Sequence, residues 1–421
     1  MRPTVGRVRT TRLMTMLVAA ALPAALLPAV SSPAQAAEGR HIAYRDWASG
    51  PELRSGTLHG LTARKGTLQL STPVGTRGRY DFGRWRSPWV EQRFSLTELV
   101  PSWTASTPRD TFLKVEVRGR GAGRSSWDTI TDWALDDRTV KRRSFSGQTD
   151  DLGSVAWDTW KTAGVSAWQL RLTLFRRSGT KASPLVERVG AMVSRLPSST
   201  GVTTSRPGVA SRRGTVLRVP RYSQMVHRGA YPQYDNGGEA WCSPTSTTMV
   251  LGYYDALPPA SSYRWVREDY PDRVVAHLAR NTYDAGFGGT GNWPFNTAYA
   301  ASRTGKAFVT RLRSLREAER FVAAGIPLVT SVTFGSGQLS GAPISSTNGH
   351  LMVVVGFRKN GDVVVNDPAA STRRGVRRTY DRGQFEDAWL KRGSAGGSGG
   401  LTYVVHDDGH PLPPRGKRRN W

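Results

Sequence analysis

The chain of 421 residues contains a single cysteine, Cys242, within the stretch EAWCSPTSTTMVLGYY. It directly precedes Ser243-Pro244 and a run whose apolar spacing predicts a helix, and proline suits a first helical turn. A lone cysteine leaves three alternatives, namely an intermolecular disulfide, a buried structural thiol or a reactive nucleophile. Because the N–H groups at a helix start stabilise a thiolate, the position favours the nucleophile. Metal sites built on CxxC pairs are excluded.

A nucleophilic thiol needs a base, and the chain offers seven histidines. His350 follows a predicted turn, STNG, and opens the apolar strand LMVVVGF, so a rigid element would fix its ring. We therefore predict that His350 is the base. The other six have plainer roles: His41 and His59 lie in the β-rich half, His227 lies in a loop that could line a site, His277 fits a structural place in a helix, and His406 and His410 fall at the end of the last strand and in the tail.

The third group is expected across a hairpin from His350. Asn360-Gly361 is a strong signal for a two-residue turn, and a hairpin centred there places Leu351 opposite Ala370. Asp367 then lies within a few residues of His350, where its carboxylate could accept the Nδ1 proton and stabilise the imidazolium. Two alternatives remain open: the sequence NDP is an ordinary turn, or Asn366 orients the ring.

These stretches together resemble the papain-fold cysteine peptidases related to the bacteriocin-leader-processing peptidases, family thirty-nine, and in particular its secreted, stand-alone members. The resemblance covers roughly residues 215–408. The matching stretches are VPRYSQ, WCSPTSTTMVLGYY, GNWPFNTAYAA, NGHLMVVVGF and VVVNDPA.

The resemblance implies a Cys-His-Asp triad of Cys242, His350 and Asp367, with Gln224 helping to form the oxyanion hole. Gln233 in YPQY is a rival for that position, because 18 residues separate Gln224 from Cys242. Ser243 departs from the glycine that commonly follows the family's cysteine. The leader-processing relatives cut after paired glycines and are fused to an exporter. We do not extend that specificity to this chain, which shows no phosphate loop.

The elements that must position these residues fall in a predicted α+β, papain-like domain, residues 216–408. Apolar spacing predicts a helix from Pro244 to Leu257 with one buried face. A second helix begins at Ser314, has Glu317 in a capping box and stops at Gly325. Strands are predicted at residues 326–334, in the hairpin 350–367 and at residues 401–408.

The first half of the mature chain, residues 38–198, is predicted to be an all-β sandwich or jelly roll, which makes the protein multidomain. Alternating patterns or turn-bounded runs predict strands at residues 66–71, 112–119, 127–135, 168–175 and 185–193. Nine of the fourteen tryptophans fall here, from Trp47 to Trp168. They favour a packed core, and stacking on the sugar rings of a polysaccharide is the alternative.

The remaining segments concern targeting and charge. Residues 1–37 have the arginines, apolar run and AQA site of an export signal, residues 199–215 are predicted to be a linker, and residues 409–421 a disordered basic tail. The formal charge of +27 becomes +23 without the four signal arginines. This charge suits an anionic cell-wall polymer, although arginine-rich composition alone is the alternative. Scattered basic residues disfavour nucleic acid, and no later run could span a membrane.

We therefore predict a secreted, monomeric cysteine peptidase, with or without attachment to the cell wall, that acts on peptide or protein substrates through an acyl-enzyme and needs no cofactor or metal. One alternative keeps the triad but acts as a peptidoglycan-peptide amidase or acyl transferase. Another is a surface or carbohydrate-binding protein whose peptidase domain is degenerate.

Overall fold

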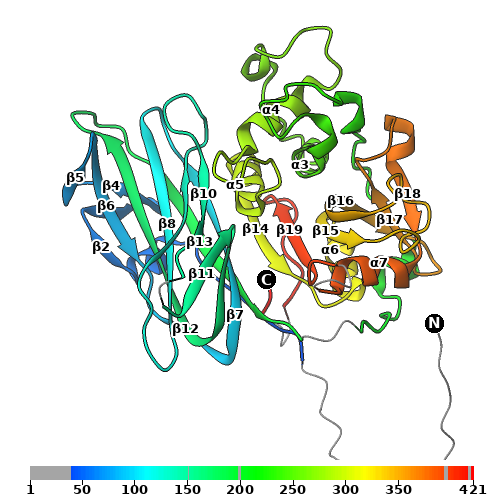
Figure 1. Cartoon of the computed structure of the whole chain (residues 1–421), viewed down its shortest axis with the longest axis horizontal. Coiled ribbons are helices and arrows are strands. Elements are labelled where there is room, and N and C mark those ends of the chain that lie inside the picture. Colours follow the sequence, from blue (N-terminus) through cyan, green and yellow to red (C-terminus); the bar gives the residue numbers. More distant parts are fainter. Residues whose placement is uncertain (1–38, 150, 198–200, 393–396, 416–418) are drawn as a thin grey trace, which may run out of the picture. The chain divides into compact units, whose positions relative to one another are not determined.

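The computed structural model describes residues 39–149, 151–197, 201–392, 397–415 and 419–421, so the predicted export signal lies outside the described residues. An all-β region is followed by a domain with both helices and a sheet (Figure 1). Within the described part of the chain, no helix is long and apolar enough to cross a membrane.

The N-terminal region consists of thirteen strands and one short helix. The strands are β1 (His41–Trp47), β2 (Thr57–His59), β3 (Leu61–Arg64), β4 (Thr67–Leu70), β5 (Gly75–Arg77), β6 (Tyr80–Arg86), β7 (Val90–Ser106), β8 (Thr111–Arg120), β9 (Asp128–Trp133), β10 (Arg143–Gly147), β11 (Gly153–Trp157), β12 (Thr159–Arg177) and β13 (Leu185–Arg195), and α1 (Gly50–Arg54) follows β1.

These strands pair into one connected sheet. The sequence patterns predict a sandwich or jelly roll for the same residues. The main order is β11-β10-β9-β8-β12-β7-β13-β4-β3, with β1 on β13 and β6 on β12. The long strand β12 joins two parts of the sheet, because its first half pairs with β11 and β7 and its second half with β8 and β6. A sheet that bends along such strands can bury one face without dividing into two sheets.

The tryptophans of this region form its core. Six of the nine are at most 2% exposed, and edge-to-face contacts join Trp47 to Trp85 and to Trp168, and Trp103 to Trp133. The predicted alternation in β12 is confirmed, since Trp168 and the leucines at positions 170, 172 and 174 are fully buried. The sequence prediction of a packed core therefore holds for most of these rings.

The C-terminal domain places helices around a six-stranded antiparallel sheet in the order β14-β19-β15-β16-β17-β18 (Figure 1). Its elements are α2 (Val209–Arg213), η1 (Met225–His227), η2 (Gly238–Ala240), α3 (Cys242–Tyr253), η3 (Ala260–Tyr263), α4 (Arg273–Thr282), α5 (Trp293–Thr304), β14 (Lys306–Arg311), α6 (Leu315–Ala323), β15 (Leu328–Phe334), β16 (Thr347–Phe357), β17 (Val363–Asn366), η4 (Arg373–Val376), β18 (Arg377–Tyr380), α7 (Arg382–Leu390) and β19 (Leu401–His406).

Helix α3 is buried more completely than the sequence predicted. It begins at Cys242 and ends at Tyr253, and every residue from Ser243 to Leu251 is buried. The prediction of a single apolar face continuing to Leu257 was therefore wrong. The serine and threonine side chains of the helix are buried together with its apolar ones. No face of the helix is therefore exposed between Ser243 and Leu251.

Helix α6 confirms the predicted start but only half of the predicted capping box. The side chain of Ser314 accepts the Glu317 N–H, as expected of an N-cap. The Glu317 carboxylate instead accepts the backbone N–H of Arg313. Gly325, with a φ of +78°, follows the helix end at Ala323.

The predicted hairpin forms with a different turn. The Arg358 N–H donates to Asp362 and the Gly361 N–H to Arg358, so three residues rather than two close the loop, with Gly361 at a φ of +100°. A register shift between Val354 and Gly356 then makes Val353 the partner of Asn366. The expected pairing of Leu351 with Ala370 was therefore wrong, because both the longer turn and the shift displace the strands.

Anchoring contacts are found in the described parts of the predicted linker and tail, residues 201–215, 409–415 and 419–421. Helix α2 lies within residues 201–215, and the Glu319 carboxylate on α6 accepts the N–H groups of Gly208 and Ser211. At the other end Trp421 is fully buried and stacks edge-on against Phe321. Both predictions followed from polar or basic composition, which does not reveal single anchoring side chains.

Residues Gly39–Trp421 form one compact unit, and contacts join its β-rich part to the C-terminal domain. Asp284, which precedes α5, accepts hydrogen bonds from the backbone and side chain of Ser144 on β10. Arg311 on β14 forms a buried ion pair with Glu98 on β7 at 2.8 Å.

Candidate active site

The cysteine occupies the first position of α3, where helix N–H groups lack acceptors within the helix. Trp241, the preceding residue, is fully buried and donates its indole N–H to the carbonyl of Tyr234. Ser243, where the resembling family commonly has glycine, is buried with its hydroxyl 3.0 Å from that of Tyr403 on β19. The loop thus accommodates serine through a hydrogen bond, and Cys242 alone in this turn is partly exposed.

His350 and Asp367 lie together, as the hairpin predicted. The ring of His350 is 3% exposed, Asp367 is fully buried, and His350 Nε2 lies 2.8 Å from Asp367 Oδ1. The predicted use of Nδ1 was wrong. With the strands displaced from the expected register, the far nitrogen of the ring reaches the carboxylate, and Nδ1 remains for the thiol.

Further hydrogen bonds hold the Asp367 carboxylate. The Ala369 N–H donates to Oδ1 at 3.0 Å, and the Tyr380 hydroxyl on β18 donates to Oδ2 at 2.8 Å. Sequence reasoning missed Tyr380, since no spacing relates it to the site before β17 and β18 pair. Asn366, the alternative orienter, points elsewhere: its amide donates to the carbonyls of Val219 and Pro220.

The electrostatics of the pair favour an imidazolium beside a carboxylate. Burial by itself lowers the pKa of His350, but the charge of Asp367 and hydrogen bonds to Asp367 and Cys242 outweigh it, so the pKa is raised. Burial would raise the pKa of Asp367, and the charge of His350 with the hydrogen bonds to the carboxylate lowers it instead. His350 therefore connects the thiol on one side to the carboxylate on the other.

Gln224 lies beside Cys242 in the same cavity and is 3% exposed. Its backbone N–H donates to the Pro368 carbonyl, and its side-chain amide donates to the Glu239 carbonyl at 2.6 Å. The amide has a second hydrogen, so it can still donate into the cavity. The rival Gln233 is exposed and does not line this cavity.

The long segment between Gln224 and Cys242 turns back on itself. Two short helices, η1 and η2, lie in it, and Gly237 between them has a φ of +113°. A Cβ on Gly238 would meet the Gln224 carbonyl at 2.4 Å, so only glycine allows this close approach. The segment thereby returns Glu239 to the side chain of Gln224, despite the 18-residue separation.

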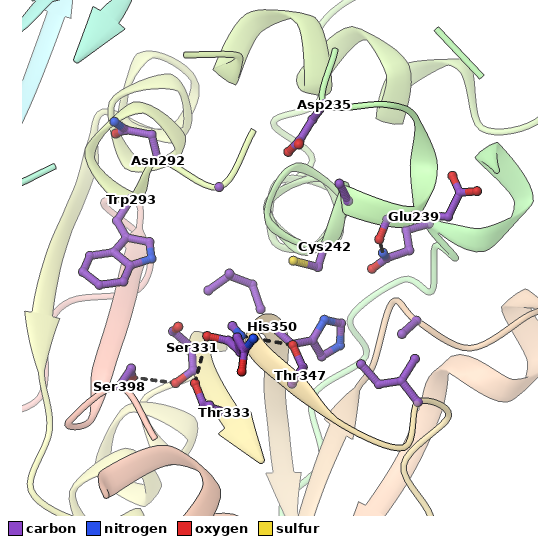
Figure 2. A pocket seen from close by; sticks show the side chains of 18 of the residues that line it. Asp235, Glu239, Cys242, Asn292, Trp293, Ser331, Thr333, Thr347, His350 and Ser398 are labelled. Carbon is purple, nitrogen blue, oxygen red and sulfur yellow. Dashed lines mark hydrogen bonds between the residues drawn. The ribbon is translucent and has the colours of Figure 1, made fainter. Parts of the chain in front are cut away.

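A cavity of about 740 Å³ contains Cys242, His350 and Gln224 in its lining. Figure 2 shows Cys242 on α3 facing the end of β16 that carries His350, with Trp293 on the far wall. The aromatic rings of Trp157 and Phe287 also line the cavity, with centroids 5.5 Å apart.

Acidic groups line the same cavity. Asp158, Asp235 and Glu239 contribute to its wall. Asp158 accepts the Trp293 N–H at 3.2 Å, and burial raises its pKa to about 6. Among the described residues, no group of three or more His, Cys, Asp or Glu is placed to hold a metal ion.

The other histidines remain outside this arrangement. His227 is fully buried with its ring 5.8 Å from Trp241 and 5.1 Å from Tyr270, and burial lowers its pKa to about 4. His277 lies on α4 with Nε2 3.1 Å from the Tyr299 hydroxyl, in agreement with a structural role.

Comparison with known proteins gives family matches for both halves. Residues 43–194 match the family model described as Peptidase C39 N-terminal domain, and residues 216–396 match the one described as Peptidase_C39 like family. The search of curated proteins found no match. Among solved structures, a Paenibacillus sp. cycloisomaltooligosaccharide glucanotransferase complexed with cycloisomaltoheptaose is similar at 8% identity and a TM-score of 0.15, with 76% of this chain and 37% of that chain covered. A likeness of that size carries no argument. The two family matches support a C39-like peptidase, and this family suggests a cysteine peptidase.

Proposed function

We propose that the protein is an exported cysteine peptidase that cleaves peptide bonds through Cys242, His350 and Asp367. One observation carries the proposal: a thiol at the start of a helix shares a cavity with an imidazole that is hydrogen-bonded to a buried carboxylate. A merely structural cysteine needs no such partners. The family matches agree with this chemistry.

In the first half-reaction the thiolate of Cys242 attacks the peptide carbonyl carbon and a C–S bond forms. The carbonyl oxygen becomes an oxyanion, which the Gln224 amide and the Cys242 backbone N–H stabilise as donors. The His350 imidazolium gives its proton to the leaving nitrogen as the C–N bond breaks. Asp367 fixes the ring through Nε2 and stabilises its charged form.

In the second half-reaction water hydrolyses the acyl-enzyme. Neutral His350 takes a proton from the water as its oxygen attacks the thioester carbon. The C–S bond then breaks, a carboxylic acid leaves, and the thiolate and imidazolium are restored. The reaction is balanced without a metal or organic cofactor.

Three finer features belong to the same proposal. A papain-like arrangement is supported by the order of a cysteine on a helix followed by a histidine and an aspartate on a sheet. Export is supported by the charged, apolar and small-residue segments of residues 1–37. A peptidase domain with its own N-terminal domain is supported by the matches of both halves to peptidase family models.

Digestion of a broad peptide library tests the proposal, with wild-type protein and the Cys242→Ala variant compared at equal concentration. Wild type is expected to cut and the variant to be inactive, while both melt at the same temperature within a few degrees. The aromatic and acidic cavity lining predicts a preference for aromatic or basic side chains near the cut. Equal cutting by both proteins, or none by either, contradicts the proposal.

A further inference from the structure

Strands β6, β12 and β8 carry a basic face on the side turned away from the tryptophan core. While Trp168 and Leu170 on β12 point inward, Gln169 and Arg171 alternate with them on the other side. We call this surface the arginine–tryptophan face; its members are Arg84, Arg86, Trp89, Arg118, Trp127 and Arg171.

Arginines lie opposite each other on this face. In the pairing of β12 with β6, Arg171 is the direct partner of Arg86, and Thr173 is the partner of Arg84. Like charges directly opposite each other in a sheet are destabilising. Glu116 compensates the charge of Arg171 within the protein, and an anion beside Arg86 would compensate the other charge.

Two indole rings organise the guanidinium groups. The Cζ atoms of Arg118 and Arg171 both lie 4.4 Å from the centre of the Trp127 ring. Arg118 and Arg120 lie 5.1 and 4.6 Å from the centre of the Trp89 ring. Both guanidinium groups on Trp127 also donate two hydrogen bonds within the protein, Arg118 to Gln169 and Arg171 to Glu116. Arg84 and Arg86 are therefore the groups left to make bidentate contacts with an oxyanion.

A hollow of about 160 Å³ opens on this face. It is lined by His59, Arg84, Arg86, Trp127 and Arg171, a set of donors and one ring. Its lining contains no carboxylate. The chemistry of the lining suits a tetrahedral oxyanion.

Among the described residues, Arg171 is the one arginine of the face with a carboxylate partner. Glu116 is committed to Arg171 through two contacts of 2.6 Å, and Asp132 pairs with Lys114. In the part of the chain that the structure describes, no carboxylate forms an ion pair with Arg84, Arg86 or Arg118. Burial and the positive charges of Arg124, Arg86 and Arg171 lower the pKa of Arg118 to about 10.

We propose that the arginine–tryptophan face binds the phosphate groups of a phosphate-linked polymer other than nucleic acid. The guanidinium groups of Arg84 and Arg86, both on β6 and in the lining of the hollow, recognise phosphates along such a chain. Each indole already has two guanidinium groups against it, which leaves little ring surface for stacking by bases or sugars. This second site gives the protein a means of attachment to an anionic surface, independent of the peptidase site.

Calorimetric titration of the full chain with inorganic polyphosphate of defined length, at several salt concentrations, tests the proposal. The Arg84→Gln/Arg86→Gln variant is expected to bind about tenfold more weakly and with a shallower salt dependence. Arg54 and Arg64 are exposed and lie elsewhere in the β-rich region. Their double glutamine variant makes the same change in net charge and is expected to bind within about twofold of wild type.

Several outcomes overturn the proposal. Equal losses in the two double variants mean that net charge alone attracts the polymer. A thymidine oligonucleotide or polygalacturonate of matched charge that binds as tightly as polyphosphate contradicts the assigned ligand. The Arg84→Lys/Arg86→Lys variant keeps the charge but loses bidentate contacts, so its expected affinity is intermediate. Wild-type affinity in that variant argues against a built phosphate site.

Discussion

The cavity that contains Cys242 and the arginine–tryptophan face differ in how their charged groups are compensated. In the cavity, His350 and Asp367 are buried and paired with each other at 2.8 Å, and Tyr380 and Ala369 satisfy the remaining acceptors of the carboxylate. On the face, Arg86 and Arg171 lie opposite each other, and the charge of Arg171 is the one compensated, by Glu116.

The difference indicates which region an external ion of opposite charge would stabilise. A buried charge must have its partner within the protein, because desolvation without a partner is costly. The paired site therefore has its compensating charge within the protein. An exposed cluster of like charges is tolerated in water but is stabilised by an external anion. Mutations can separate the two regions if the chemistry and the anion binding are independent.

The largest effect is expected from His350→Ala. Loss of the group that carries the proton should reduce kcat/KM by about 10³-fold or more. Polyphosphate affinity should stay within about twofold, since the face does not involve this residue. Steady-state cleavage and titration of the same preparation measure both. A variant that keeps more than a tenth of its activity contradicts the assignment of the base.

Replacing Asp367 by Asn should lower activity by about 10²- to 10⁴-fold and change its pH dependence. The carboxylate raises the pKa of His350 while burial lowers it, so removal of the negative charge lowers that pKa. The imidazolium then loses its proton at a lower pH, so the alkaline limb of the kcat/KM profile moves to lower pH. An unchanged alkaline limb would show that Asp367 does not control His350.

Gln224→Ala should reduce kcat by about 10²-fold, since one oxyanion donor is removed. Gln233→Ala is the matched control and should retain wild-type kcat, because Gln233 is exposed and outside the cavity. The two are compared in single-substrate kinetics. A larger loss in the Gln233 variant would transfer the oxyanion role to that residue.

On the other region, Trp127→Ala should weaken polyphosphate binding by about fivefold, because Arg118 and Arg171 lose the ring that orients them. Peptide cleavage should be unchanged. If cleavage falls in parallel with binding, the regions are coupled and the comparison drawn above is wrong.

An effect of similar, small size is expected from Tyr380→Phe. The change removes one hydrogen bond to Asp367, and a loss of about two- to tenfold in kcat/KM corresponds to roughly 1 kcal/mol. Because Asp367 keeps its charge in this variant, the alkaline limb of the pH profile should move much less than in Asp367→Asn. A change in KM alone would indicate a different role.

The predicted proximity of the candidate site residues is found where local rules apply. A cysteine before a helix start and a histidine and an aspartate on one hairpin depend on neighbours in the chain, and these residues do lie together. The predicted register of the hairpin β16–β17 was wrong by a small shift. Turn length and strand irregularities depend on packing, as the shift near Gly356 shows. The prediction of a single apolar face for α3 was wrong because the burial of a helix also depends on packing.

The sequence by itself determined the chemical groups, the two regions of different secondary structure and the excess of positive charge. Only the tertiary structure decided which nitrogen of His350 meets Asp367, that Tyr380 supports the carboxylate, and that arginines from β6, β8 and β12 share one surface with two tryptophans. Such contacts join residues far apart in the chain. Their geometry depends on how whole sheets pack, and local propensity carries no information about it.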